Sequence, residues 1–173
     1  PLKFNKEKIL KLRPVFKQDG SITAANASSI NDGAAAVLVA SDSMVNSRKP
    51  YAKIIAHTSF AMDPIYFTKA PIFAIEKVLK KADMSINDID LFEINEAFSC
   101  VSLAAMRKLE ISKDKINIYG GAVSLGHPIG ASGARILVTL LNALENTKQK
   151  YGIACLCIGG GEASAMIVER INS

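Results

Sequence analysis

Apolar positions along the chain follow two spacings in turn, one typical of helices and the other of strands. Apolar residues recur every three or four positions, as on one face of a helix, over residues 4–12, 71–82, 97–109 and 134–144. Runs of strand length lie between these segments, at residues 34–40, 53–62, 89–94, 116–119, 152–158 and 163–169. Strands that alternate with helices in this way predict an α/β layered domain.

The predicted strand at residues 152–158 is apolar on both of its faces. Ile153, Cys155 and Cys157 share one face, because side chains two positions apart in a strand point the same way. Ala154 and Leu156 share the opposite face. Since strands with two apolar faces are typical of sheets that helices cover on both sides, we expect such a sheet here.

Composition and charge are those of an ordinary globular protein, with 49% hydrophobic and 21% charged residues. No run approaches the roughly 18 apolar residues that span a bilayer, so no membrane partner is expected. The net charge of +5 comes largely from basic residues scattered over the first seventeen positions. A solvated helix face is the favoured interpretation, and no nucleic-acid partner is expected. Attraction of an anionic ligand is the alternative.

The cysteines indicate a reducing compartment. Only three are present, Cys100, Cys155 and Cys157, and their spacing matches neither a disulfide framework nor a zinc site. A bridge between Cys155 and Cys157, which are two apart in a strand, would be strained. The chain begins with proline rather than methionine, from which we expect that it starts inside a longer protein.

Three short segments place a polar or reactive side chain beside small residues where a strand is expected to end. They are the segments at 95–98 (NEAF), 120–135 (GGAVSLGHPIGASGAR) and 157–161 (CIGGG). Ligands bind at the carboxyl ends of strands in open α/β sheets, so the three segments could form one pocket. Each also has a structural interpretation: Asn95 as a helix cap, His127 as a turn residue and Cys157 as a small buried hydrophobe. His57, in a strand-like stretch, is interpreted as structural.

Together these segments resemble the thiolase family, whose patterns NEAF, GGAxxxGHPxGxSGxR and CxGGG all occur here in order. The stretch at 23–36 (TAANASSINDGAAA) is similar to the family as well. The resemblance implies half of a five-layer α/β/α/β/α architecture. It implies that residues 1–45 are the end of the loop domain and N-terminal half, and that residues 46–173 are the C-terminal thiolase domain.

The resemblance also implies the mechanism, in which a cysteine of the N-terminal half carries the acyl group. No cysteine precedes Cys100, so this chain lacks that nucleophile and is expected to be inactive alone. His127 matches the histidine that takes the nucleophile's proton, and Cys157 matches the cysteine that exchanges the α-proton of the acetyl unit. Asn95 matches the residue that holds an oxyanion-hole water beside the histidine. Gly159 matches the backbone amide of the second oxyanion hole.

The partners implied by the resemblance are coenzyme A thioesters. Ala24 and Ser28 match positions that line the pantetheine arm, and Phe67 is assigned to the same site. Family members are dimers or tetramers, so a homo-oligomer is expected of the complete protein.

Three further features, residues 24–27 (AANA), Phe67 after Asp63-Pro64, and residues 120–124 (GGAVS), resemble one subgroup of the family, the mitochondrial acetoacetyl-CoA thiolases of animals. Members of that subgroup bind a potassium ion through backbone carbonyls, which match those of Ala24, Ala25, Ala27 and Val123. The subgroup also favours a mitochondrial location, with a cytoplasmic one as the alternative.

The activity implied is that of an acetyl-CoA C-acetyltransferase, which cleaves acetoacetyl-CoA or condenses two acetyl units. A medium- or long-chain 3-ketoacyl-CoA thiolase is the second possibility. A decarboxylating ketoacyl synthase is disfavoured, because that related group has a histidine where Asn95 stands. A non-catalytic module that binds coenzyme A or lipid is an alternative of a different class.

Overall fold

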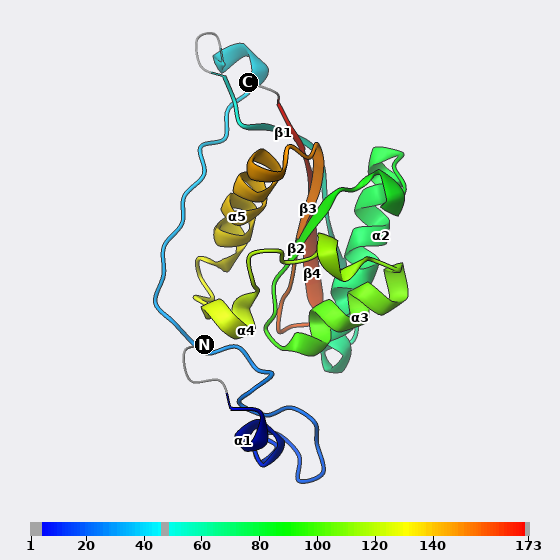
Figure 1. Cartoon of the computed structure of the whole chain (residues 1–173). Coiled ribbons are helices and arrows are strands. Elements are labelled where there is room, and N and C mark those ends of the chain that lie inside the picture. Colours follow the sequence, from blue (N-terminus) through cyan, green and yellow to red (C-terminus); the bar gives the residue numbers. More distant parts are fainter. Residues whose placement is uncertain (1–4, 46–48, 172–173) are drawn as a thin grey trace.

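The computed structural model describes residues 5–45 and 49–171, and a four-stranded sheet lies at its centre (Figure 1). The strands stand in the order β1 (Ala52–Ala61), β4 (Glu162–Arg170), β3 (Tyr151–Cys157) and β2 (Leu91–Ile94). β4 runs antiparallel to both of its neighbours, whereas β2 and β3 are parallel. The carboxyl ends of β2 and β3 therefore lie at the same edge of the sheet.

Helices cover both faces of this sheet, as the two apolar faces of β3 predicted (Figure 1). On one face lie α2 (Ala70–Ala82) and α3 (Ser99–Leu109), and the core between them and the sheet includes Ile153 and Cys155 of β3. On the other face lies α5 (Ser132–Thr147), which packs on the neighbouring Ala154. The predicted α/β layered class is confirmed.

Over residues 5–45 and 49–171, two short helices complete the fold, α1 (Lys6–Leu10) and α4 (Ala122–Leu125), together with four 3-10 turns. The turns are η1 (Asp42–Met44), η2 (Pro64–Lys69), η3 (Ile86–Asp88) and η4 (Lys113–Lys115). Within the described ranges, no helix combines the length and the apolar character needed to cross a bilayer. Phe4, where the first helix was predicted to begin, and residue 46, where the second domain was predicted to begin, lie outside the described residues.

The strand predicted at residues 34–40 does not form. This stretch is an extended segment outside the sheet, and it runs beside the layer that contains α5 (Figure 1). Leu38 and Val39 remain 89% and 68% exposed. An apolar run becomes a strand only where a neighbouring strand takes up its backbone hydrogen bonds, and the described part of the chain supplies none.

The strand predicted at residues 116–119 is reduced to a single bridge between Ile116 and Phe92 of β2. Asn117 ends the extended conformation because its φ angle is +47°, in the left-handed region. Gly120, three residues later, also has a positive φ angle of +90°. The glycine-rich segment therefore does not follow a regular strand, and it contains the short helix α4.

Candidate active site

Asn95 follows the last residue of β2 and is held there from the neighbouring strand. Its backbone N–H donates a hydrogen bond to the carbonyl oxygen of Cys155 in β3, at 2.9 Å. The side chain is buried, and its Nδ2 atom lies 3.3 Å from Nε2 of His127. The interpretation of Asn95 as a helix cap is wrong, because α3 begins only at Ser99 and Phe98 is its N-cap.

His127 lies on the loop between α4 and α5 and is fixed at both its backbone and its ring. Its backbone N–H donates to the carbonyl oxygen of Ser29, at 2.9 Å. Its Nδ1 atom lies 2.6 Å from Oγ of Ser132, the first residue of α5, and that Oγ lies 3.0 Å from the carbonyl oxygen of Pro128. The structure thus brings His127 and Asn95 together, as the sequence predicted.

These contacts assign the tautomer of the His127 ring. The carbonyl oxygen of Pro128 can only accept, so the hydroxyl of Ser132 donates to it. The hydroxyl oxygen then accepts from Nδ1–H of His127. Nε2 is left with its lone pair, which accepts from the amide of Asn95. A neutral imidazole held in this form presents Nε2 as a base.

The surroundings of His127 favour this neutral form. Partial burial lowers the pKa of the imidazole below its ordinary value of 6.5, because burial penalises the charged ring. The positive charge of Arg135 lowers the pKa further. His127 therefore stays unprotonated at neutral pH and can take a proton from a reacting group.

An extended strap, residues 29–33, runs along the loop that carries His127. Ile30 bridges to His127, and a side chain at Gly126, whose φ angle is +95°, would collide with Asn31. A side chain at Gly33 would collide with the ring of Pro128. Both glycines therefore permit the close approach of the strap. Sequence reasoning missed Ser29 as a support of His127 and Asn31 as its neighbour against Gly126.

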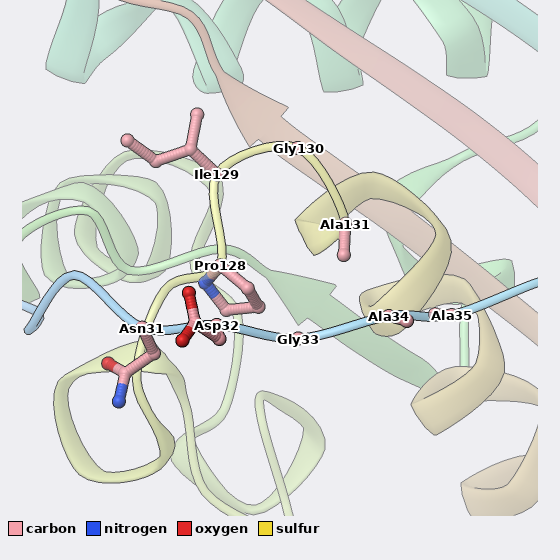
Figure 2. Close-up of a pocket in the computed structure, with 9 residues that line it drawn as sticks. All are labelled: Asn31, Asp32, Gly33, Ala34, Ala35, Pro128, Ile129, Gly130 and Ala131. Carbon is pink, nitrogen blue, oxygen red and sulfur yellow. The ribbon is translucent and has the colours of Figure 1, made fainter.

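The strap also borders a shallow pocket of about 370 Å³ (Figure 2). The pocket is lined by residues 31–35 of the extended segment and residues 128–131 of the loop. Asn95, His127 and Cys157 do not line it. It lies beside the predicted reaction centre and does not mark that centre.

Cys157 is the last residue of β3, at the same edge of the sheet as Asn95. The parallel register pairs Ile94 of β2 with Cys155 of β3. Asn95 therefore follows this pair by one residue along β2, and Cys157 follows it by two residues along β3. Among the described residues no hydrogen bond joins Cys157 to Asn95 or His127. Burial raises the pKa of the Cys157 thiol to about 11, so the thiol is protonated at neutral pH. Cys157 is therefore equipped to donate a proton.

The three glycines after Cys157 differ in their surroundings. Gly161 has a φ angle of +102°, and a side chain there would collide with the carbonyl oxygen of Met62. At Gly160 a side chain would meet the carboxylate of Glu162. Gly159 alone opens onto free space, since no described atom lies within 4 Å of the position of a side chain. The opening leaves room for a ligand to approach the amide of Gly159.

Gly159 and Gly161 give a matched pair of variants. Gly161→Ala should lower the free energy of unfolding by about 1–3 kcal/mol, because alanine tolerates the positive φ angle poorly and would displace Met62. Gly159→Ala should leave stability within about 0.5 kcal/mol, as for an ordinary exposed substitution. Urea denaturation of both variants measures the difference. Equal losses would contradict the different roles that the structure gives the two positions.

Comparison with known proteins identifies the family. The family model described as "Thiolase, C-terminal domain" matches residues 48–170, and "Thiolase, N-terminal domain" matches residues 2–43. The chain belongs to the thiolase family. An acetyl-CoA acetyltransferase of Yarrowia lipolytica is 52% identical over 98% of this chain, and the match covers 43% of that protein. This thiolase chain thus spans less than half the length of the curated relatives that it matches.

Solved structures agree with this assignment. The acetyl-CoA acetyltransferase of Bacillus anthracis matches with a TM-score of 0.92 and 42% identity, over 95% of this chain and 42% of that one. Human mitochondrial 3-ketoacyl-CoA thiolase matches with a TM-score of 0.90 and 38% identity, over 98% and 44%. The Acat5 thiolase of Ascaris suum, solved in complex with coenzyme A, matches with a TM-score of 0.88 and 41% identity, over 98% and 45%. These structural matches show that the chain has the thiolase fold.

The residues assigned to coenzyme A by the thiolase resemblance are more dispersed than the catalytic ones. Ala24 is exposed, whereas Ser28 is half-buried and its hydroxyl donates to the carbonyl oxygen of Ala97, at 2.9 Å. Phe67, in η2, packs edge-on against Phe98, with the ring centres 6.3 Å apart. Ser28 and Phe67 therefore both contact the NEAF segment. Ala24 lies four residues before Ser28, in the segment at 23–36 that also contains the strap.

The segments that carry the predicted potassium ligands both contact that NEAF segment as well. Ala27 bridges to Phe98, and the N–H of Val123 donates to Oε2 of Glu96, at 3.3 Å. The carbonyl oxygen of Asn26 accepts from Ser99. Within the described ranges, no backbone N–H is recorded as donating to the carbonyls of Ala24, Ala25, Ala27 or Val123. Free carbonyl oxygens are suitable ligands for a hard monovalent cation.

Glu96 is a support of the site to which sequence reasoning assigned no role of its own. Its Oε1 atom accepts from the hydroxyl of Ser102, at 3.1 Å, and its Oε2 atom accepts from Val123. A side chain at Gly121 would collide with this carboxylate. Glu96 thus joins the NEAF segment to the start of the loop that carries His127. The signal in the sequence was the pair of glycines at 120–121, which permits the approach.

Proposed function

We propose that this chain supplies the C-terminal catalytic half of an acetyl-CoA C-acetyltransferase, an acetoacetyl-CoA thiolase. The observation that carries the proposal is the Asn95–His127–Ser132 chain of hydrogen bonds, which leaves a basic Nε2 atom at the sheet edge where Cys157 ends its strand. The 52% identity to an acetyl-CoA acetyltransferase supports the same reaction. The acyl-accepting cysteine comes from sequence outside these 173 residues.

In the cleavage direction, the external cysteine attacks the 3-keto carbonyl after Nε2 of His127 has taken its proton. The bond between C2 and C3 of the substrate then breaks, and its electron pair remains on C2 of the departing acetyl-CoA. The thiol of Cys157, kept protonated by burial, delivers a proton to that carbon. Coenzyme A finally takes the acyl group from the cysteine. Condensation uses the same groups in reverse.

Charge develops on two oxygens during this sequence. Protonated Nε2 of His127 and a water held by Asn95 would stabilise the enolate oxygen, and Oδ1 of Asn95 has no hydrogen-bond partner within the described ranges. The N–H of Gly159, beside open space, would stabilise the oxygen of the acyl-enzyme. Each such donor typically contributes a factor of about 10² to 10³ to the rate.

Ala24, Ser28 and Phe67 remain our proposal for the coenzyme A site, supported by the coenzyme A complex of the Ascaris suum thiolase. The free carbonyls of Ala24, Ala25, Ala27 and Val123 would hold potassium, and the ion would order residues 24–28 against the NEAF segment. Activity of the complete protein should then be higher in potassium chloride than in sodium chloride at equal ionic strength. Equal rates in the two salts would contradict the proposal that these carbonyls bind potassium.

The decisive experiment compares this chain with the complete protein. The purified 173-residue chain should show no thiolysis of acetoacetyl-CoA, because the acyl-accepting cysteine is absent, whereas the complete protein should cleave it. Loss of absorbance of the magnesium–acetoacetyl-CoA enolate measures both. Turnover by the chain alone would refute the proposed division of roles, and an inactive complete protein would refute the function.

A 3-ketoacyl-CoA thiolase for longer acyl chains is the second candidate, supported by the 38% identity to the human mitochondrial enzyme. Rates with 3-ketoacyl-CoA substrates of four to sixteen carbons distinguish the two. A rate that falls steeply beyond four carbons favours the acetoacetyl-CoA enzyme. A homo-oligomer and a mitochondrial location stay predictions for the complete protein, to be checked by light scattering and by fractionation.

A further inference from the structure

Asn117 occupies the outer edge of β2 and satisfies backbone groups there that no strand of the described chain covers. Its N–H donates to the carbonyl oxygen of Phe92, at 2.8 Å. Its Oδ1 atom accepts from the N–H of Ile94, at 2.8 Å, and its Nδ2 atom donates to the carbonyl oxygen of the same residue, at 2.9 Å. Ile94 is only 1% exposed, so water cannot replace these bonds without rearrangement.

The residue type suits this position for two physical reasons. A carboxamide carries one acceptor and one donor side by side, so it can serve both backbone groups of Ile94 as a residue of a neighbouring strand would. Asparagine also tolerates a positive φ angle better than other residues with side chains, apart from aspartate, and Asn117 has φ of +47°. Aspartate would keep the acceptor but would lose the donor.

Asn117 also joins the two segments that meet at the candidate site. The carbonyl carbon of Ile94 is bonded to the nitrogen of Asn95, whose N–H donates to β3. The last peptide of β2 is thus held by β3 on one side and by Asn117 on the other. The carbonyl oxygen of Asn117 in turn accepts from the N–H of Gly120, at 2.8 Å, where the loop to His127 begins.

We propose that Asn117 is a positioning residue that holds Asn95 in contact with Nε2 of His127. It touches no reacting atom, and it acts through the backbone of Ile94 and the start of the glycine-rich loop. This inference rests on the proposed function for its effect on rate. Its effect on the Asn95–His127 contact can be measured without any reaction.

The kinetic test uses Asn117→Gly in the complete protein, because glycine keeps the positive φ angle and removes only the carboxamide. We expect kcat to fall about ten- to a hundredfold, as for a small misplacement of catalytic groups, with KM for acetoacetyl-CoA within about twofold. Asn117→Asp, which lacks the donor, should also lower kcat. Asn87→Gly, an exposed asparagine in η3, is the matched control and should have wild-type kcat. Unchanged kcat in Asn117→Gly would overturn the proposal.

The second test follows the His127 ring by nitrogen NMR in the 173-residue chain, where His57 is the only other histidine. A hydrogen bond donated to Nε2 favours the neutral ring, so its loss in Asn117→Gly should raise the pKa of His127, with the ring signals of His57 as the internal reference. Ordinary destabilisation would not single out one histidine. An unchanged His127 titration would overturn the proposal. If the complete wild-type protein proves inactive, the proposed function fails and this measurement still decides the inference.

Discussion

Replacing His127 by alanine in the complete protein should lower kcat by about 10² to 10⁴, the usual contribution of a general base. The substitution removes Nε2, the one ring nitrogen whose lone pair is directed at the sheet edge. KM should change little, because the assigned substrate-binding residues remain. Initial rates of acetoacetyl-CoA thiolysis at saturating coenzyme A measure the effect.

The chain offers a close control for this prediction. His57, the other histidine, lies exposed on β1, and His57→Ala should keep the wild-type rate. Because burial and Arg135 lower the pKa of His127 below 6.5, the acidic limb of the rate profile should also lie below pH 6.5. Wild-type kcat in His127→Ala would remove this residue from the mechanism.

The same comparison applies to the two cysteines of β3. Cys157→Ala should lower kcat by a similar factor of about 10² to 10⁴, because the thiol that we propose as the proton donor to C2 is lost. Cys155→Ala should retain the rate, since that thiol is fully buried under α2 and contacts the carbonyl oxygen of Pro71. Similar kcat values for the two variants would contradict the assignment of Cys157.

The residues that the sequence identified are those whose chemistry is visible in a short motif. Asn95 and His127 stand out because each is a polar residue among small ones, and the structure places them 3.3 Å apart. Spacing also predicted the order of helices and strands around them. These inferences succeed because periodicity and residue type are local properties of the chain.

What the sequence left hidden depends on distant contacts. Ser132 reads as one more small residue of a glycine-rich stretch, yet its hydroxyl fixes the tautomer of His127. Asn117 interrupts an apolar run that looks like a strand, because its left-handed conformation and its carboxamide serve β2 instead. The run at residues 34–40 has the composition of a strand, but its partner is not among the described residues. Local pattern alone cannot reveal such partners.

Glu93 lies in β2 two residues before Asn95, and it should make the stability of the fold depend on pH. The carboxyl is 2% exposed, and its nearest cation, Nη1 of Arg135, is 3.6 Å from Oε2, too far for a hydrogen bond. Burial therefore prevails over this attraction, and with a smaller contribution from Glu96 it raises the pKa of Glu93 from 4.5 to about 7.

A carboxyl whose pKa is raised on folding binds its proton more tightly in the folded state. Its contribution to stability is therefore fully present below pH 4.5 and is lost as pH rises to about 7 and beyond. The loss amounts to about 3 kcal/mol over that window. Glu93→Gln keeps the shape of the side chain and cannot ionise, so this variant should lack the loss.

Urea denaturation of wild type and Glu93→Gln at pH 4.5 and pH 8 measures this contribution directly. The difference in unfolding free energy between the two proteins should shift by about 3 kcal/mol in favour of the variant as pH rises. Glu76→Gln, which removes an exposed carboxylate on α2, should follow the wild-type profile. A constant difference between wild type and Glu93→Gln would mean that Arg135 keeps the buried carboxylate charged at both pH values. In that case Glu93 and Arg135 would form a true buried ion pair, and breaking it by Arg135→Met should then cost several kcal/mol.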